Sequence, residues 1–243
     1  MSSFKNRPLK IRLMRKGIQQ IFSEVSGTYE LVNHVLTFGL DILWRKKAAR
    51  EAAKAGGYYW LDVCSGTGEM AQNLSRISDG KVKIVSVDFS FPMLAKASEK
   101  KLIPNVSFAL AEAGTLPFPD ETFNLITISF AIRNINTRKE TLKNYLVEFH
   151  RVLKPGGYFV NLETSQPSSK IIRRLFHLYI KLTVKPVGSL LSGYKPAYSY
   201  LSFTIPRFYP PEEFSSLLYQ ARFARVTYKA LLFGISAIHT AIK

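Results

Sequence analysis

Apolar residues in the middle of the chain fall into short runs, separated by stretches with helical spacing. Five runs have the length of buried strands: they end at Val63, Asp88 and Leu110 or cover residues 124–131 and 158–163. Helical spacing covers residues 67–78, 92–101 and 137–152 between most of these runs. Strands that alternate with helices predict βαβ units and a largely parallel sheet.

The two ends of the chain depart from this alternation. Residues 9–25 carry apolar side chains at helical spacing with basic residues between them, which predicts an amphipathic basic helix. Near the other end, a helix around 211–222 precedes two β-rich runs, 223–233 and 235–242, that meet around Gly234. Two such runs with a short junction predict an antiparallel hairpin at the edge of the sheet.

Residues 164–210 interrupt the alternation with five prolines and one helical piece at about 169–184. Its basic side comprises Lys170, Arg173, Arg174, His177 and Lys181, and its apolar side Ile172, Leu175, Phe176, Tyr179 and Leu182. We interpret this segment as a lid over the active-site edge of the sheet. The chain then forms one domain, 1–243, with residues 1–50 as a helical cap and 164–210 as the lid.

The charge of the protein is unevenly distributed. It has 34 Lys and Arg residues against 17 Asp and Glu, a net charge of +17. Residues 1–23 contain six basic residues and residues 164–211 contain seven, with no acid in either stretch, whereas residues 24–163 are nearly balanced. Such segments attract a polyanion, either nucleic acid or an anionic membrane surface. A generally basic, solvated surface is the plainer alternative.

Other features of the composition narrow the class of protein. The single cysteine, Cys64, excludes a disulfide framework and a thiolate zinc cluster, and the four scattered histidines lack metal-ligand spacing, so we expect no metal site. No uncharged apolar run is long enough for a membrane-spanning helix, and no apolar stretch of a signal peptide follows the basic N-terminus. We therefore expect a cytoplasmic protein whose charge suits peripheral contact with the inner face of the cell membrane.

The sharpest local signal is the stretch 61–69, Leu-Asp-Val-Cys-Ser-Gly-Thr-Gly-Glu. A buried strand enters a glycine-rich turn there, and a helix begins immediately after it. Gly66 and Gly68 let the backbone approach a ligand closely, and the amides at the helix start can bind a carboxylate or a phosphate. Twenty residues after Gly68, the next strand ends at Asp88, whose carboxylate can accept hydrogen bonds from both ribose hydroxyls of an adenosine.

This turn alone leaves three interpretations open. Gly66, Gly68 and Ala71 satisfy the relaxed dinucleotide fingerprint of a dehydrogenase, and a tight turn can also serve packing alone. Two features favour a methyl donor instead. Asp62 lies at the strand end before the glycines, where it can hold a cationic amino group. Residues 111–113, Ala-Glu-Ala, follow the third strand, where they can contact an adenine ring.

Further motifs carry a family resemblance. They are Leu-Pro-Phe-Pro-Asp at 116–120, Ile-Ser-Phe-Ala-Ile-Arg-Asn-Ile at 128–135, Arg-Val-Leu-Lys-Pro-Gly-Gly at 151–157 and Leu-Glu-Thr-Ser at 162–165. Together they resemble the ubiquinone/menaquinone biosynthesis C-methyltransferases, the UbiE/COQ5 family, from about Phe22 to the C-terminus. The chain departs from the family pattern at several positions, among them Asp41, where the family has His, and Glu69, where it has Asp.

The resemblance implies the Rossmann-like α/β fold of class I S-adenosylmethionine-dependent methyltransferases, with a mostly parallel seven-stranded sheet that ends in an antiparallel hairpin. It also implies S-adenosylmethionine as the cofactor. From the glycine turn and the resemblance together, the cofactor-binding residues are Asp62, Gly66, Thr67, Gly68, Asp88, Glu112, Ala113 and Ser129. An alternative role for Ser129 is to cap the turn that follows it.

The same resemblance places Arg133, Asn134 and Tyr29 at the acceptor, a polyprenylated quinol that is methylated on a ring carbon. Such a carbon becomes nucleophilic when a neighbouring hydroxyl loses its proton. We hypothesise that Arg133 stabilises the resulting oxyanion while Asn134 and Tyr29 orient the ring. Plainer roles stay open: Arg133 can pair with an acid such as Glu163, and Tyr29 can be a packing residue.

A lipid acceptor gives the basic segments a role, because amphipathic basic helices lie in membrane interfaces. We expect the helices at 9–25 and 169–184 to contact an anionic membrane, and docking of these helices onto the sheet is the competing role. Methylation of another small molecule or of RNA is the alternative activity, but the sequence has no added recognition domain that would favour nucleic acid. A non-catalytic scaffold is disfavoured, because Asp62, Gly66, Gly68 and Asp88 are all present. The oligomeric state stays open, a homodimer included.

Overall fold

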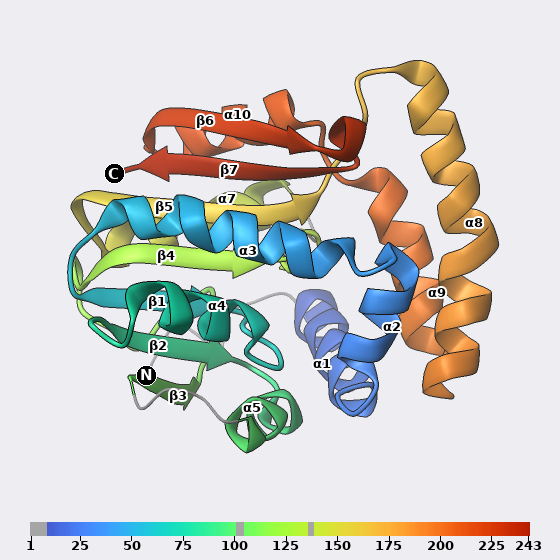
Figure 1. Ribbon diagram of the computed structural model, residues 1–243, viewed down its shortest axis with the longest axis horizontal. Coiled ribbons are helices and arrows are strands. Elements are labelled where there is room, and N and C mark those ends of the chain that lie inside the picture. The colour runs from blue at the N-terminus through green and yellow to red at the C-terminus, as the bar shows by residue number, and fades with distance from the viewer. Residues whose placement is uncertain (1–8, 101–104, 136–138) are drawn as a thin grey trace.

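A seven-stranded sheet lies at the centre of the computed structural model, which describes residues 9–100, 105–135 and 139–243 (Figure 1). The strands are β1 Tyr59–Val63, β2 Lys83–Asp88, β3 Val106–Leu110, β4 Phe123–Ser129, β5 Leu153–Thr164, β6 Ala224–Leu231 and β7 Ser236–Ile242. They lie in the order β3-β2-β1-β4-β5-β7-β6. Strands β1 to β5 run parallel to one another, and β7 pairs antiparallel with both β5 and β6. The predicted fold class is confirmed, including the hairpin.

Helices connect the strands and cover the sheet. They are α1 Leu9–Glu24, α2 Tyr29–Thr37, α3 Leu40–Ala52, α4 Glu69–Ser78, α5 Phe91–Glu99, α6 Ile132–Ile135, α7 Lys139–Val152, α8 Lys170–Ser192, α9 Lys195–Thr204 and α10 Pro211–Gln220. Short 3-10 turns are η1 Ala53–Ala55, η2 Ile205–Arg207 and η3 Leu232–Gly234. The predicted helix limits at 101 and 137, and residues 1–8 of the predicted cap, lie outside the described residues.

The two faces of the sheet have separate apolar cores, because helices cover both (Figure 1). Helices α3 and α4 lie over one face, where Trp44 and Leu74 are buried in one cluster with Trp60. Helices α7 and α10 lie over the other face, where Phe149 stacks on Phe159 and Phe214 is fully buried. The buried strands therefore need apolar residues on both sides, which explains their continuous apolar runs.

A third apolar cluster lies beyond the carboxyl ends of the parallel strands. Helices α1, α2, α8 and α9 form it, with Phe22, Val32, Phe176 and Tyr198 among its buried side chains (Figure 1). The N-terminal helices and the 164–210 segment thus pack against each other. Both stand over the sheet edge that carries the glycine turn.

Helix α8 extends beyond the predicted piece at 169–184, because it continues through Pro186 to Ser192. Its last turns pack closely on α9: a Cβ added to Gly188 would lie 2.1 Å from Tyr198 Cδ1. Proline removes one helical hydrogen bond. The close contact with α9 compensates for this loss. The predicted end of the helix at about residue 184 was therefore wrong, because α8 continues to Ser192.

The predicted faces of α8 were also partly wrong. Phe176 is buried as expected, but Leu175 and Leu182 are exposed on the outer side, which they share with Arg174 and Lys181. Only a narrow side of the helix packs on the rest of the molecule. In the described residues, no helix combines the length and the apolar composition that crossing a bilayer requires.

Candidate active site

The glycine-rich turn between β1 and α4 has an unusual backbone. Cys64, Gly66 and Gly68 have φ angles of 53°, 55° and 79°. At Gly68 an added Cβ would lie 3.1 Å from the Cβ of Ala97 on α5, whereas at Gly66 it would meet no described atom within 4 Å. Gly68 therefore serves close packing on α5, and Gly66 borders open space that a ligand can approach.

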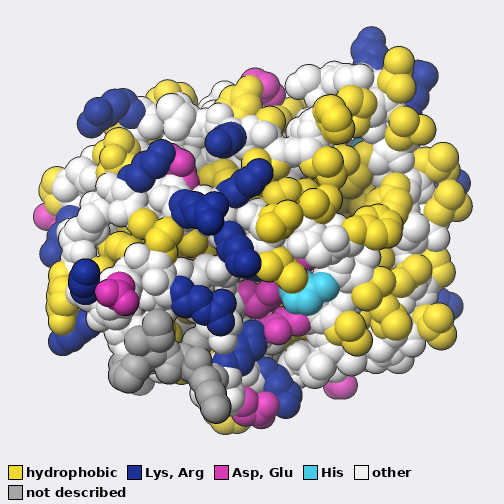
Figure 2. Space-filling model, viewed as in Figure 1, with side chains coloured by type: hydrophobic (Ala, Val, Ile, Leu, Met, Phe, Trp, Pro, Cys, Tyr) yellow, Lys and Arg dark blue, Asp and Glu magenta, His cyan; other side chains and the backbone are white. Residues whose placement is uncertain are grey.

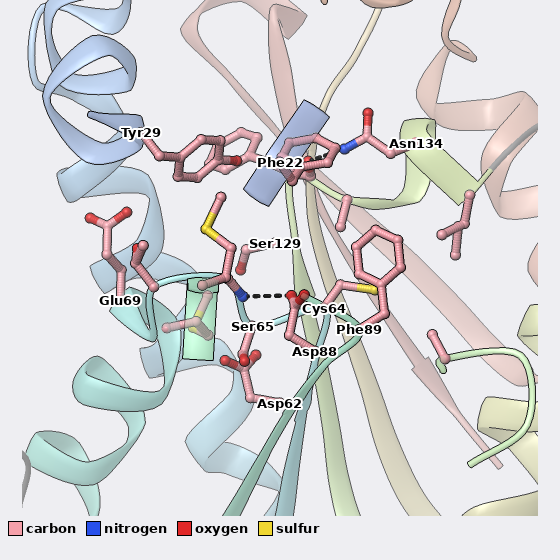
Figure 3. Close-up of a pocket in the computed structure, with 18 of the residues that line it drawn as sticks. Phe22, Tyr29, Asp62, Cys64, Ser65, Glu69, Asp88, Phe89, Ser129 and Asn134 are labelled. Carbon is pink, nitrogen blue, oxygen red and sulfur yellow. Dashed lines mark hydrogen bonds between the residues drawn. The ribbon is translucent and has the colours of Figure 1, made fainter. Parts of the chain in front are cut away.

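Asp88 ends β2 directly beside this turn (Figure 3). Its Oδ2 accepts a hydrogen bond from the Gly66 amide and its Oδ1 one from the Ser90 amide, each at 2.9 Å. A carboxylate has about four acceptor sites, so capacity remains for ribose hydroxyls. Burial raises the pKa of Asp88 to about 6.

Asp62 lies on β1 below the turn, with one oxygen satisfied and the other not. Its Oδ1 accepts a hydrogen bond from the Thr127 hydroxyl at 2.7 Å, while its Oδ2 is buried without a hydrogen-bond partner in the described part of the chain. Burial raises the pKa of Asp62 to about 7. A buried acceptor without a partner is costly, and a cationic amino group would satisfy it.

The ends of β3 and β4 supply the remaining predicted cofactor residues. Glu112 follows β3 and accepts a hydrogen bond from the Tyr145 hydroxyl at 3.0 Å, and Ala113 next to it is buried. Ser129 ends β4, and its buried hydroxyl has no hydrogen-bond partner among the residues described. The alternative role of Ser129 as a turn cap therefore has no hydrogen bond to support it.

These strand ends surround one cavity (Figure 3). The predicted cofactor residues that line it are Asp62, Gly66, Thr67, Asp88, Glu112, Ala113 and Ser129. Gly68 is not among its lining residues and contributes through the packing of the turn. Ile18 and Phe22 of α1 also line the cavity, so the N-terminal helix covers the turn.

A second cavity, with a volume of about 360 Å³, adjoins the first. Its walls come mainly from α2, α3, α8 and α9 and are largely apolar: Leu36, Leu40, Trp44, Leu175, Phe176, Ile180, Val184, Leu201 and Ile205. Tyr29, Arg45 and Phe130 line both cavities. These three residues therefore mark the junction between the two cavities. We call the first the polar cavity, because the carboxylates of Asp62, Asp88 and Glu112 line it, and the second the apolar cavity.

Arg133 lines the apolar cavity and not the polar one. Its guanidinium forms a buried ion pair with Glu163, and its backbone amide donates to Glu163 Oε2 at 3.2 Å. The structure thus contains the plainer pairing of Arg133 with Glu163. The Nε of Arg133 is nevertheless buried without a hydrogen-bond partner within the described ranges, so one donor of the guanidinium is left unsatisfied.

Asn134 and Tyr29 lie above the glycine turn in the polar cavity (Figure 3). Asn134 Oδ1 is buried, and the described residues give it no hydrogen-bond partner. The Tyr29 ring packs edge-on against Phe22, with ring centroids 6.0 Å apart, and burial raises the pKa of its hydroxyl. Tyr29 therefore has the packing role and also a place at the cavity junction.

Arg45 and Glu69 are site residues that the sequence analysis missed. Arg45 is buried, pairs with Asp41 and, at 3.1 Å, with Glu69, and lies 5.0 Å from the centroid of the Phe130 ring. Asp41 and Glu69 are two of the positions where the chain departs from the family pattern. Asp41 and Glu69 thus contact the same buried guanidinium, that of Arg45. The spacing of Asp41 and Arg45, four residues in one helix, is the signal that could have revealed part of this cluster.

Glu30, His34 and Glu69 bring candidate metal-ligand atoms within 4.8 Å of one another. Each also has a partner outside this cluster: Glu30 pairs with Lys100, His34 Nδ1 lies within hydrogen-bond distance of Asp41 at 2.9 Å, and Glu69 pairs with Arg45.

Sequence comparisons relate nearly the whole chain to known proteins. A model of the ubiE/COQ5 methyltransferase family matches residues 10–243. The chain is 36% identical over 238 residues to the ubiquinone/menaquinone biosynthesis C-methyltransferase UbiE of Geobacter sulfurreducens. The alignment covers 96% of this chain and 91% of that relative. It is 33% identical over 230 residues to the demethylmenaquinone methyltransferase of Staphylococcus saprophyticus, with 94% and 97% covered.

Solved structures share the fold at lower sequence identity. A SAM-dependent methyltransferase from Thermotoga maritima superposes with a TM-score of 0.61 at 19% identity, over 93% of this chain and 99% of that one. Human N-acetylserotonin methyltransferase in complex with SAM gives a TM-score of 0.57 at 19% identity, over 89% of this chain and 57% of that one. At this level of sequence identity, the similarity to these two structures shows only a shared fold.

Proposed function

Because the chain belongs to the ubiE/COQ5 methyltransferase family, we propose that it transfers the methyl group of S-adenosylmethionine to a ring carbon of a polyprenylated quinol. The proposed acceptor is of the demethylmenaquinol or demethoxy-ubiquinol type, in keeping with the names of the relatives. The observation that carries the proposal is the junction of a polar and an apolar cavity at Tyr29, Arg45 and Phe130. A donor with a charged tail and an acceptor with an apolar tail need two such adjoining sites.

S-adenosylmethionine is the cofactor, and the polar cavity fits it. The unpartnered Oδ2 of Asp62 would hold the amino group of its methionine tail, and Asp88 would accept from its ribose hydroxyls. Glu112 and Ala113 would lie on the adenine side, and Ser129 and Thr67 would complete the wall. Once bound, the cofactor supplies a methyl group on a positively charged sulfur. A nicotinamide dinucleotide carries no cationic amino group that could pair with Asp62.

The acceptor would place its ring at the junction and its prenyl side in the apolar cavity. Arg133 lines that cavity, and its unpartnered Nε would donate a hydrogen bond to the ring oxygen as this oxygen loses its proton. Arginine itself stays protonated, so water would take that proton. Glu163 would fix the guanidinium, while Asn134 and Tyr29 would orient the ring for an in-line approach.

The surrounding elements suit a lipid acceptor. In the proposed arrangement the described part of residues 1–50 acts as the cap and 164–210 as the lid of one domain. Helix α1 and helix α8, which replaces the shorter predicted piece, would contact an anionic membrane on its cytoplasmic side. The absence of acidic residues from 164–211 supports this contact.

The function is tested by incubating the purified protein with methyl-labelled S-adenosylmethionine and either a bacterial lipid extract or total RNA. The proposal expects label in a quinone-containing lipid that gains the mass of one methyl group. Label in RNA alone would support the alternative activity and would overturn the proposal.

A further inference from the structure

The mouth of the apolar cavity is surrounded by exposed apolar side chains. Phe38, 82% exposed, and Leu175, 62% exposed, belong both to the cavity wall and to the molecular surface. We call the surface formed by Phe38, Leu175, Leu178, Leu182, Leu232 and Phe233 the apolar rim. Figure 2 shows hydrophobic side chains gathered on this side of the molecule, over α2, α8 and the end of the β6–β7 hairpin.

The rim is continuous across elements that lie far apart in sequence. The Phe38 and Tyr179 rings have centroids 6.2 Å apart, and the Tyr179 hydroxyl donates to the Leu36 carbonyl at 2.6 Å, so the end of α2 adjoins α8. From the hairpin, Leu232 lines the cavity together with Leu175, and Phe233 beside it is 75% exposed with φ of 56°. An apolar phenylalanine held on such a tight turn has no role in the protein core.

The outer side of α8 mixes leucines with basic residues. Its exposed positions include Ile171, Arg174, Leu175, Leu178, Lys181, Leu182 and Lys185, which follow one another at helical spacing. A helix that faces water alone carries mainly polar residues there, whereas a helix in a membrane interface carries both apolar and basic residues.

Basic side chains lie among the rim leucines on α8 and beside the rim on α3. No acidic residue occurs in 164–211, and Lys46, Lys47 and Arg50 are exposed on α3. Lys and Arg side chains gather over α3 on the face that also carries the rim (Figure 2). Such a surface, with exposed apolar side chains and basic residues among and beside them, is complementary to an anionic lipid surface.

We propose that the apolar rim inserts into an anionic lipid bilayer and opens the apolar cavity directly to the acyl-chain region. This inference rests on the proposed lipid acceptor. A polyprenyl chain then passes from the bilayer into the cavity along Phe38, Leu175 and Leu232 without crossing water. The basic residues of α3 and α8 hold the surface against lipid headgroups.

The first test measures binding of the full-length protein to phosphatidylcholine vesicles with and without phosphatidylglycerol. The variant Leu178→Ser/Leu182→Ser removes rim side chains that line neither cavity. The matched control Ile77→Ser/Val147→Ser changes two exposed helical residues on α4 and α7. We expect the rim variant to bind anionic vesicles at least about tenfold more weakly than wild type and the control to stay within about twofold.

Equal vesicle binding by the rim variant and its control would overturn the proposal. So would a wild-type dimer that the rim variant converts to monomer with no change in vesicle binding, because the rim would then be a contact between two copies. The variant Lys181→Glu/Lys185→Glu tests the contribution of positive charge. It should weaken binding to anionic vesicles and leave the weak binding to neutral vesicles unchanged.

The second test separates this inference from the proposed function. Methylation is measured on a long-chain quinol embedded in anionic vesicles and on a short-chain, water-soluble analogue. The rim variant should lose about tenfold in rate on the embedded quinol and keep the wild-type rate on the analogue. Equal losses on both substrates would contradict a delivery role for the rim. If the wild type methylates neither quinol, the proposed function fails, and the vesicle-binding result still decides whether the rim inserts.

Discussion

Replacing Glu163 with glutamine tests the buried ion pair that holds Arg133. Glu163 is 1% exposed and accepts hydrogen bonds from the Arg133 guanidinium, from the Arg133 amide, and from the amide and hydroxyl of Thr164 at 2.8 and 3.0 Å. Glutamine has nearly the same shape but carries no charge, and one of its two polar atoms donates instead of accepting. The guanidinium of Arg133 would then stay buried without its counter-ion.

The expected effect is large because removal of one partner from a buried pair costs about 3–5 kcal/mol. We expect Glu163→Gln to lower the free energy of unfolding by that amount and to reduce kcat, since Arg133 loses its fixed position. The matched control is Glu51→Gln, which breaks an exposed pair with Lys54 on the surface. An exposed pair contributes at most about 1 kcal/mol.

Urea denaturation measures both changes, provided that the slope of the transition stays the same. A loss for Glu163→Gln no larger than that for Glu51→Gln would refute the reasoning about the pair. The double variant Arg133→Met/Glu163→Met separates stability from chemistry, because an apolar replacement of a buried pair often restores stability. This double variant should be stable and nearly inactive. Wild-type turnover in it would remove Arg133 from the proposed mechanism.

Three further predictions concern the polar cavity and the lid. The affinity for S-adenosylmethionine, measured by calorimetry, should rise between about pH 5 and pH 8. The pKa values of Asp88 and Asp62 are raised to about 6 and about 7, so both carboxyls are protonated at the lower pH. An affinity that does not change with pH would contradict this. Their raised pKa values also mean that the ligand-free protein loses stability as pH rises from about 4 through 7. Asp62→Asn should therefore raise the melting temperature near pH 8 and weaken cofactor binding, and a lower melting temperature would count against it. Gly188→Ala should reduce the free energy of unfolding by about 1–3 kcal/mol through overpacking on Tyr198, whereas Gly27→Ala, where an added Cβ meets nothing described, should change it little.

The features that the sequence predicted well depend on local pattern. Strands end at Val63 and Asp88 as expected, because a strand, a glycine turn and a helix follow one another within a few residues. The parallel topology then brings both strand ends to one edge of the sheet, so the polar cavity could be anticipated from the order of elements alone.

The apolar cavity could not be anticipated, because its walls come from residues far apart in the sequence. Trp44 and Leu232 share it, although nothing in their local sequence relates them. Arg45 also looked like one more surface cation among 34 basic residues. It is buried only because Asp41 and Glu69 converge on it from two helices.

The most direct measurement of the central claim is a single-turnover reaction with trideuteromethyl-labelled S-adenosylmethionine and a synthetic demethylmenaquinol. We predict one deuterated methyl group on a ring carbon for each S-adenosylhomocysteine formed, with the position read by NMR. A methyl group on oxygen, or S-adenosylhomocysteine without methylated quinol, would contradict the meeting of donor and ring at Tyr29, Arg45 and Phe130.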